Sequence, residues 1–422
     1  MQISVPCGRN QLLAEISDAR ISGVLRSRLE QYEPALVETE LVEAALRSPI
    51  GSEPLEKLAK GKQNIVLIAS DHTRPVPSKV LIPPMLAAIR RGNPDARITI
   101  LIATGCHRET TKAELIEKFG EEIVANEHIV IHDCAEDAAM VTIGTLPSGG
   151  ALRINRIAAE ADLLVSEGFI EPHFFAGFSG GRKSVLPGIA AKETVCWNHN
   201  AEFIGSPFAR TGILEGNPIH RDMVYAARAA KLVFICNVVI NAKHRVVGAF
   251  AGDCEQAHLA GTEFLKGLCQ CPRVPADIVI TSNNGYPLDQ NIYQAVKGMT
   301  AAEATCNENG VIVMVAACND GHGGEAFMKT MTQDLTPTQI LTRIRATPKQ
   351  DTVPDQWESQ ILARILSRFH VVLVSEADPK LVKSMKMHHA RDLSQALEIA
   401  GNLLGKSGSI TVIPEGISTI II

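Results

Sequence analysis

The stretch from Glu167 to His199 concentrates residue types that could do chemistry. It reads EGFIEPHFFAGFSGGRKSVLPGIAAKETVCWNH and contains two histidines, a glycine-rich turn and an Arg-Lys-Ser triplet. Glycines after a strand let backbone N–H groups approach an anion, because no Cβ stands in the way. Lysine is the usual residue for covalent capture of a carbonyl-type carbon. Histidine is the commonest metal ligand and the acid or base that works nearest pH 7.

This stretch does not match the common phosphate-binding motifs. A Walker A loop needs a glycine directly before its Lys-Ser pair, and Arg182 occupies that position. The G-x-G-x-x-G dinucleotide fingerprint is also absent. A glycine-rich loop alone is often only a turn, and a lone histidine can be structural. The candidate residues are His173, Gly177, Ser179, Gly180, Gly181, Arg182, Lys183, Ser184 and His199.

Two further clusters follow runs that read as buried strands. Asp71, Thr73 and Arg74 come directly after NIVLIAS, and His107 comes shortly after RITILIA. Ligands of open α/β sheets bind outside the carboxyl ends of the strands, which favours a site at both places. Asp71 could accept hydrogen bonds from ribose or hydroxyl groups, and Arg74 could hold a phosphate or carboxylate in a fork. The alternatives are a proline-rich loop that caps the next helix and a histidine that only lines its loop.

The second half of the chain contributes a possible substrate-binding face. Tyr293 and Lys297 are spaced i, i+4 on a predicted helix, and Gln294 and Lys297 are spaced i, i+3. That face could hold a carboxylate, although a solvated helix face is the alternative. Trp357, one of only two tryptophans, could shield a site or simply pack.

The elements that position these residues alternate along the chain. Short Val- and Ile-rich runs alternate with amphipathic segments of helical length, such as 78–91 and 112–119, and Thr111 and Glu114 form a capping-box pattern. This alternation predicts parallel sheets flanked by helices. The runs expected as strands are 64–70, 97–103, 128–132, 161–166, 232–240, 245–251, 277–281, 311–316, 371–375 and 409–414.

Two prolines interrupt this pattern between Leu268 and Ala276, which predicts a domain boundary. We expect an α/β protein of two domains, each a mostly parallel sheet flanked by helices. Residues 1–267 would form the N-terminal domain with the cofactor-binding loops, the lysine and the histidines. Residues 268–422 would form the C-terminal domain with the substrate-binding residues. The active site would lie in the crevice between them.

Composition excludes several classes of protein. A net charge of −5 and an aromatic content of 4% argue against nucleic-acid binding. No run approaches the roughly 18 apolar residues of a membrane span, and the first residues lack an apolar signal region. The ten cysteines include no C-x-x-C pair, so we expect mostly small core residues in a reduced, cytoplasmic protein.

The motifs DHTRP, TGCHR, EGFIEPHFFAGFSGGRKSVLPG, WNHN and GYPLDQNIYQAVKG together resemble those of the nickel-pincer-nucleotide-dependent lactate racemases. They occur in that family's order and near its spacings, over almost the whole chain. The resemblance implies a racemase or epimerase of lactate or a close 2-hydroxy acid. It also implies a nickel pincer nucleotide, the pyridinium-3-thioamide-5-thiocarboxylic acid mononucleotide that holds nickel through two sulfurs and a ring carbon. Cofactor-synthesis enzymes encoded elsewhere would be partners.

The resemblance also implies residue roles. Lys183 would carry the cofactor covalently, His199 would be the protein ligand of nickel, and His107 and His173 would be the acid–base pair. The nucleotide would be held by Asp71, Thr73, Arg74, Gly177, Ser179, Gly180, Gly181 and Arg182. The substrate would be held by Arg74, Tyr293, Gln294, Lys297 and Trp357.

The chemistry implied by this family is coherent. Loss of the Cα hydrogen as a proton beside a carboxylate would create a dianion. Its loss as a hydride, once the hydroxyl is deprotonated, gives a neutral ketone, so reversible hydride transfer to the cofactor passes through a 2-keto acid. Two histidines are needed because the two enantiomers present their hydroxyls on opposite sides.

Other functions remain open from the sequence. A larger or dicarboxylic 2-hydroxy acid such as malate would need an additional cation in the pocket. An NAD-dependent dehydrogenase would be expected to carry the missing dinucleotide fingerprint. A non-catalytic protein that binds phosphorylated metabolites would leave His107, His173 and His199 without a function.

Overall fold

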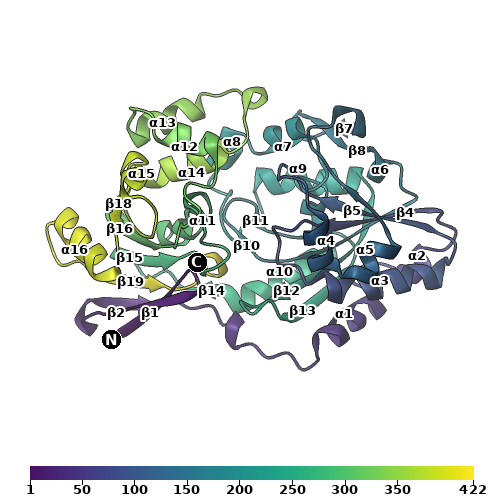
Figure 1. Cartoon of the computed structure of the whole chain (residues 1–422), viewed down its shortest axis with the longest axis horizontal. Coiled ribbons are helices and arrows are strands. Elements are labelled where there is room, and N and C mark those ends of the chain that lie inside the picture. Colours follow the sequence, from purple (N-terminus) through teal and green to yellow (C-terminus); the bar gives the residue numbers. More distant parts are fainter.

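Two six-stranded sheets carry the fold. In the computed structural model, which describes residues 1–422, they lie at opposite ends of the longest axis with helices packed on them (Figure 1). The first sheet has the order β13-β12-β9-β4-β5-β6, and only β13 runs antiparallel to its neighbour. Its strands are β4 (Asn64–Ser70), β5 (Arg97–Ala103), β6 (His128–Ile131), β9 (Leu163–Phe169), β12 (Leu232–Ile240) and β13 (Val246–Gly252).

Helices cover this first sheet, and its central strands are accordingly apolar and buried along nearly their whole length. The helices are α1 (Glu38–Arg47), α2 (Leu55–Leu58), α3 (Ser78–Gly92), α4 (Lys112–Phe119), α5 (Glu121–Asn126), α6 (Arg156–Ala159), α7 (Lys192–Asn198), α8 (Ala201–Gly205), α9 (Pro218–Ala229) and α10 (Gln256–Cys269). Small two-stranded sheets pair β7 (Met140–Thr145) with β8 (Ala151–Asn155) and β10 (Pro172–His173) with β11 (Gly177–Phe178).

The second sheet is parallel throughout, in the order β18-β17-β16-β15-β19-β3. Its strands are β3 (Ile21–Val24), β15 (Ala276–Ser282), β16 (Cys306–Val315), β17 (His370–Val374), β18 (His388–Ala390) and β19 (Ile410–Ile413). Its helices are α11 (Ile292–Glu303), α12 (Glu325–Met331), α13 (Pro337–Arg345), α14 (Gln356–Leu366), α15 (Pro379–Ser384) and α16 (Leu393–Leu404). Short strands β14 (Gln270–Cys271) and β20 (Ile420–Ile421) pair beside it.

The predicted fold class is confirmed, and several elements match residue by residue. The strands over 64–70, 97–103 and 232–240 are as expected, and α4 begins with the predicted capping box of Thr111 and Glu114. Strand β9 continues to Phe169, beyond the predicted end at residue 166. It does so because β12 pairs in parallel with β9 as far as Phe169. Buried Glu167 also accepts hydrogen bonds from the Ser70 backbone and hydroxyl on β4, each 2.8 Å long. No helix has the combined length and apolarity to traverse a bilayer.

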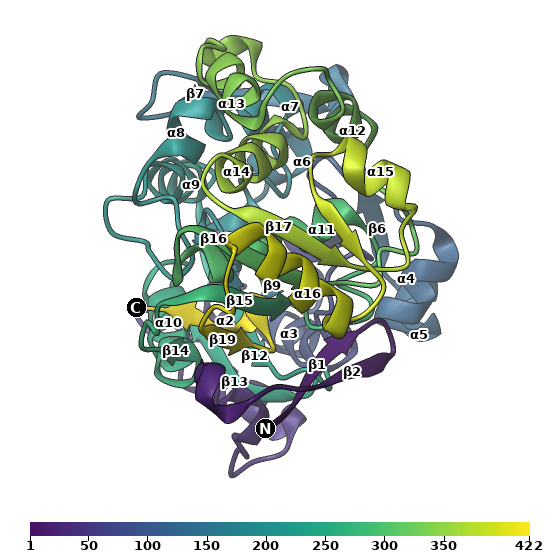
Figure 2. The ribbon, with the colours of Figure 1, turned by 90° about the vertical axis from the view of Figure 1, so that its left-hand side faces the viewer.

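The first 24 residues depart from the predicted division at residue 267. Strand β3 pairs in parallel with β19, so it is an edge strand of the second sheet. The hairpin of β1 (Gln2–Cys7) and β2 (Asn10–Glu15) lies on the same sheet beside α16 (Figure 2). Its inward residues Ile3 and Val5 share a core cluster with β15 and β16. The pairing partner of β3 lies at the other end of the chain, so no local pattern reveals it.

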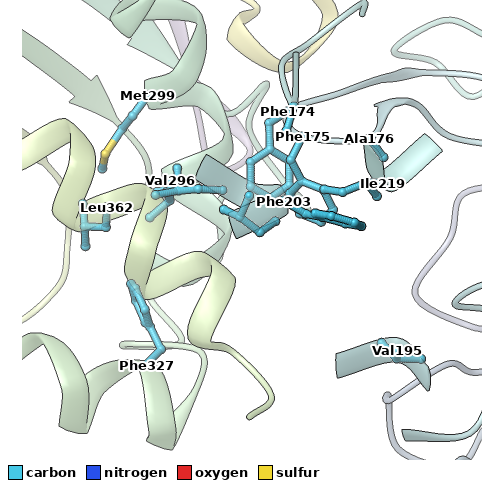
Figure 3. Packing of buried hydrophobic residues seen from close by; sticks show 14 of the residues in the cluster. Phe174, Phe175, Ala176, Val195, Phe203, Ile219, Val296, Met299, Phe327 and Leu362 are labelled. Atoms are coloured by element: carbon cyan, nitrogen blue, oxygen red, sulfur yellow. The ribbon is translucent and has the colours of Figure 1, made fainter. Parts of the chain in front are cut away.

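One hydrophobic cluster spans the two halves. Phe174 and Phe175, which follow β9, belong to the same buried cluster as Val296 and Met299 of α11. Figure 3 shows these aromatic rings facing the side chains of α11 across the junction. Packing of this kind fixes the halves against each other and defines the walls of the space between their sheets.

Candidate active site

A large cavity lies between the two halves. It has a volume of about 860 Å³ and is lined by loops after β4, β5 and β9 and by the start of α11 and α14. That volume is in the range of sites that hold a cofactor or a drug-sized ligand. The predicted site residues that line it are Thr73, Arg74, His107, His173, Ser179, Gly180, Lys183, His199, Tyr293, Gln294, Lys297 and Trp357.

Asp71 and His107 form a hydrogen-bonded pair at the carboxyl ends of β4 and β5. The His107 Nδ1 lies 2.7 Å from Asp71 Oδ2, and Asp71 is 1% exposed. The other carboxylate oxygen accepts from the Thr73 hydroxyl at 2.7 Å. Burial alone would raise the pKa of Asp71, but His107, Arg74 and Thr73 together lower it. An ionised Asp71 therefore fixes the imidazole with Nε2 left to face the cavity.

This geometry gives Asp71 a different position from the one expected. Asp71 does not line the cavity, and both its oxygens are engaged by protein groups. The sequence predicts a nucleotide or hydroxyl contact for it, whereas the structure places it behind His107. The sequence gives a partial signal for this contact, because Asp71 and His107 follow adjacent strands of one parallel sheet.

His173 lies across the cavity in a tight turn. Its Nδ1 accepts from the backbone N–H of Ala176 at 3.2 Å, and its ring packs on Phe174 and Phe175. Desolvation and the nearby cation of Lys183 hold the pKa of His173 well below 6.5. A neutral imidazole that accepts at Nδ1 carries its proton on Nε2, where it can donate to a substrate oxygen. To take up a proton at Nε2, the ring must give up its Nδ1 hydrogen bond.

Lys183 lies in the short turn of helix from Gly181 to Ser184. Desolvation, followed by the positive charge of Arg74 and Arg182, holds its pKa well below 10.5. The side chain makes no ion pair, so it can populate the neutral amine that nucleophilic capture requires.

The glycine turn before Lys183 is shaped by packing. Gly180 has φ of +83°, and a Cβ there would lie 2.8 Å from the Phe169 carbonyl oxygen. Arg182 donates to the carbonyl of Ala176 at 2.8 Å and lies 2.9 Å from His258 Nε2, and it does not line the large cavity. Gly177 and Gly181 also lie outside it. The structure therefore places these three residues where they hold the turn, and Ser179 and Gly180 where they face the cavity.

His199 has the environment of a ligand imidazole. Its Nδ1 donates to the Val195 carbonyl at 3.0 Å, its residue is 5% exposed, and its ring lies 5.0 Å from that of Trp357. Desolvation lowers the pKa of His199 to about 3, with a contribution from Lys183. The ring is therefore neutral, with Nε2 carrying a free lone pair that suits a metal.

The start of α11 supplies the far wall. Lys297 Nζ donates to Gln294 Oε1 at 2.6 Å, as the i, i+3 spacing predicts. Desolvation and Arg74 lower the pKa of Lys297. The positive charges of Arg74 and Lys297 thus repel each other in the cavity, although the two residues come from different halves. Two cations this close favour an anionic ligand between them.

Several acidic residues of the cavity wall were not predicted as site residues from the sequence, among them Glu171, Asp355 and Glu358. Glu171 accepts from Ser179 at 3.3 Å and is attracted by Arg74, Lys297 and Lys183, while desolvation raises its pKa. Asp355 and Glu358 flank Trp357 at the start of α14. The sequence offered one signal for them: Glu171 lies close to His173, and Asp355 and Glu358 lie close to Trp357.

Comparison with known proteins identifies the family. Residues 7–212 match the model of the lactate racemase N-terminal domain, and residues 271–421 match that of the lactate racemase C-terminal domain. The chain is 53% identical over 420 residues to a lactate racemase of Thermoanaerobacterium thermosaccharolyticum and 54% identical to one of Lactiplantibacillus plantarum. Each alignment covers 99% of both proteins.

This chain belongs to the lactate racemase family. It is accordingly an isomerase. Its fold superposes on the structure of the lactate racemase apoprotein from T. thermosaccharolyticum with a TM-score of 0.97 over the full length of both chains. A Thermotoga maritima protein of 17% identity shares the fold at a TM-score of 0.65.

The side chains present fit a nickel pincer nucleotide. A buried imidazole with one free nitrogen can complete the ligands of a nickel ion that a cofactor holds through soft sulfur donors. A buried lysine whose pKa is lowered by desolvation and by neighbouring cations suits covalent attachment. The cavity of about 860 Å³ leaves room for both a mononucleotide and a small acid.

Proposed function

We propose that this protein interconverts the two enantiomers of lactate. The observation that carries the proposal is that His107, in the loop after β5, and His173, at the end of β10, line one cavity with the cations Arg74 and Lys297. An anion held between those cations would place its neighbouring carbon between two bases. High identity to lactate racemases over the whole chain supports the same substrate.

The chain's own residues would act on the substrate as follows. Arg74 and Lys297 would hold the carboxylate so that the central carbon can pivot between the two histidines. The histidine on the hydroxyl side would take the hydroxyl proton, and once the central carbon has turned, the other histidine would give a proton to the same oxygen from the opposite side. Asp71 would stabilise the charge that His107 gains, since its carboxylate lies 2.7 Å from Nδ1.

We assign the hydride-accepting chemistry to a nickel pincer nucleotide, attached to Lys183 and ligated by His199. When bound, that cofactor would supply the reversible hydride acceptor, and the pathway would pass through a 2-keto acid. Thr73, Arg74, Ser179 and Gly180 line the cavity and would contact the nucleotide. Cofactor-synthesis enzymes would have to supply it.

Charges in the cavity favour a monocarboxylic substrate over a dicarboxylate such as malate. The Lys and Arg side chains that line it are Arg74, Lys183 and Lys297. With Lys183 committed to the cofactor, two cations remain for one carboxylate. The cavity wall contains no further Lys or Arg side chain that could pair with a second carboxylate.

The direct test is racemisation by protein made in cells that also make the pincer nucleotide. We expect D-lactate and L-lactate each to be converted to a racemic mixture, as followed by chiral chromatography, with malate turned over far more slowly. Absence of racemisation by protein shown to carry nickel would contradict the proposal.

Replacing Asp71 with Asn should lower the turnover number by about 10²-fold, because the amide cannot stabilise a charged His107. The loss should be largest for the half-reaction of the enantiomer that His107 serves, measured as bound 2-keto acid after acid quench of a single turnover. Asp162→Asn is the matched control, since Asp162 accepts from the backbone N–H of Asn64 at the amino end of β4. Equal losses for both enantiomers would show that Asp71 only supports the fold.

Replacing His199 with Ala should remove bound nickel, because the free Nε2 is the protein ligand assigned to it. Metal content is measured on the purified protein by mass spectrometry. His220→Gln is the control, since His220 is also a partly buried histidine whose Nδ1 lacks a hydrogen-bond partner but which lies outside the large cavity. Stoichiometric nickel in the His199→Ala protein would overturn the assignment.

A further inference from the structure

Glu358 is a buried acid without a hydrogen-bond partner. It is the third residue of α14, is 0% exposed, and belongs to the wall of the large cavity. Neither of its carboxyl oxygens has a hydrogen-bond partner, and it forms no ion pair. Buried polar groups in folded proteins are nearly always paired, so this residue requires an explanation.

The ordinary function of an acid in the first turn of a helix does not provide one. Such an acid usually accepts from the backbone N–H of the N-cap residue, here Asp355, or from other free N–H groups of the turn. Glu358 accepts from none of them. Asp355 itself has a left-handed backbone, with φ of 65°, a conformation that residues other than glycine adopt uncommonly.

The charged groups near Glu358 come from two elements. The positive charge of Lys297, on α11, lowers the pKa of Glu358, and the negative charge of Asp355, the residue before α14, raises it. Tyr293 of α11 faces the same pair of acids. Glu171 and Arg74, from the first half, act in turn on Lys297. Glu358 therefore belongs to the network of charged groups that lines the proposed carboxylate site.

An ionised carboxylate with no hydrogen bonds and no contact with water would be very costly, so Glu358 must be neutral in the free protein. Its surroundings agree, because desolvation raises the pKa of Glu358 to about 8. A neutral Glu358 leaves the positive charge of Lys297 uncompensated. Lys297 is then able to bind an external carboxylate.

We propose that Glu358 is a positioning residue for Lys297, held as a neutral acid so that Lys297 binds the substrate carboxylate and not an internal one. This inference rests on the proposed function, because it assigns Lys297 to the substrate. The inference adds a group, Glu358, whose protonation state determines whether the site can bind an anion. Ionisation of Glu358 would pair it with Lys297 and place a negative charge beside the carboxylate site.

The direction of the pH effect follows from the protonation state of Glu358 that allows substrate to bind. Substrate binding favours the protonated acid, so affinity is fully present below the pKa of Glu358 and is lost as the pH rises above it. With a pKa of about 8, the KM for lactate should rise about tenfold between pH 7 and pH 9. The turnover number should not follow this rise, because substrate that has bound restores the neutral acid.

The experiment compares the ratio of KM at pH 9 to KM at pH 7 in cofactor-loaded wild type and in E358Q. Glutamine has the shape of the neutral acid and cannot ionise, so we expect its ratio to be about one. Glu358→Met is a second neutral variant that guards against a folding defect in the first. Asp222→Asn is the matched control, because Asp222 is a buried acid of raised pKa that lies outside the cavity and accepts from Ser148.

The outcomes separate the two proposals. The positioning function of Glu358 would be supported if the KM ratio is near ten in the wild type and in Asp222→Asn but near one in both neutral variants. The same tenfold rise in E358Q would assign the effect to Lys297 itself and overturn the inference. A wild type that carries nickel but does not racemise lactate at pH 7 would refute the proposed function, whatever the behaviour of Glu358.

Discussion

Replacing His107 or His173 with Gln should lower lactate racemisation by about 10³-fold in both directions. Each turnover uses one histidine to take a proton and the other to return it, so neither can be spared. The equilibrium constant between enantiomers is one, and kcat/KM must therefore fall equally for D-lactate and L-lactate. Steady-state rates alone thus cannot show that the histidines serve opposite faces.

The half-reaction resolves the two histidines. In a single turnover followed by acid quench, the His107→Gln protein should form bound 2-keto acid from one enantiomer only, and His173→Gln from the other only. His128→Gln is the control, because His128 lies at the amino end of β6, where its Nδ1 is hydrogen-bonded to the Thr99 hydroxyl at 3.1 Å. Formation of the 2-keto acid from both enantiomers by either variant would refute the two-base arrangement.

Replacing Lys183 with Arg should abolish racemisation, with a loss of at least about 10⁴-fold, because the cofactor carries the hard step. Arginine keeps length and positive charge but cannot become the neutral nucleophile that the low pKa of Lys183 makes available. The comparison therefore tests covalent capture and not charge.

Lys192→Arg is the control for this substitution, since Lys192 is an exposed residue on α7. Racemisation by Lys183→Arg at a tenth of the wild-type rate or more would mean that the cofactor acts without a tether. Chiral chromatography of lactate incubated with each protein provides the measurement.

Most of the fold could be predicted because its signals are local. Continuous apolar runs such as those of β4, β5 and β12 identify strands buried on both faces, and Thr111 with Glu114 marks a helix start. Strand β3 could not be predicted, because its partner β19 is at the opposite end of the chain.

The candidate site was predictable to the extent that residues follow strands. His107 comes within a few residues of the end of β5, so sheet topology alone brings it to the edge where β4 and β9 also end. Lys183 is brought to the same edge by the long loop and turn that follow β9. The support of His107 by Asp71 depends on a side-chain contact between two loops, which spacing does not specify. Glu358 was missed for a similar reason, since an acid in the first turn of a helix usually faces water.

Denatured intact mass of the chain, made in cells that also make the pincer nucleotide, tests the central claim most directly. Nickel is quantified on the same sample before denaturation, and Lys183→Ala protein is measured beside it. We expect a nucleotide-sized adduct on the wild type alone, with about one nickel per chain. A bare wild-type chain without nickel, in cells proven to make the cofactor, would contradict the assignment of Lys183 and His199 and with it the proposed racemase mechanism.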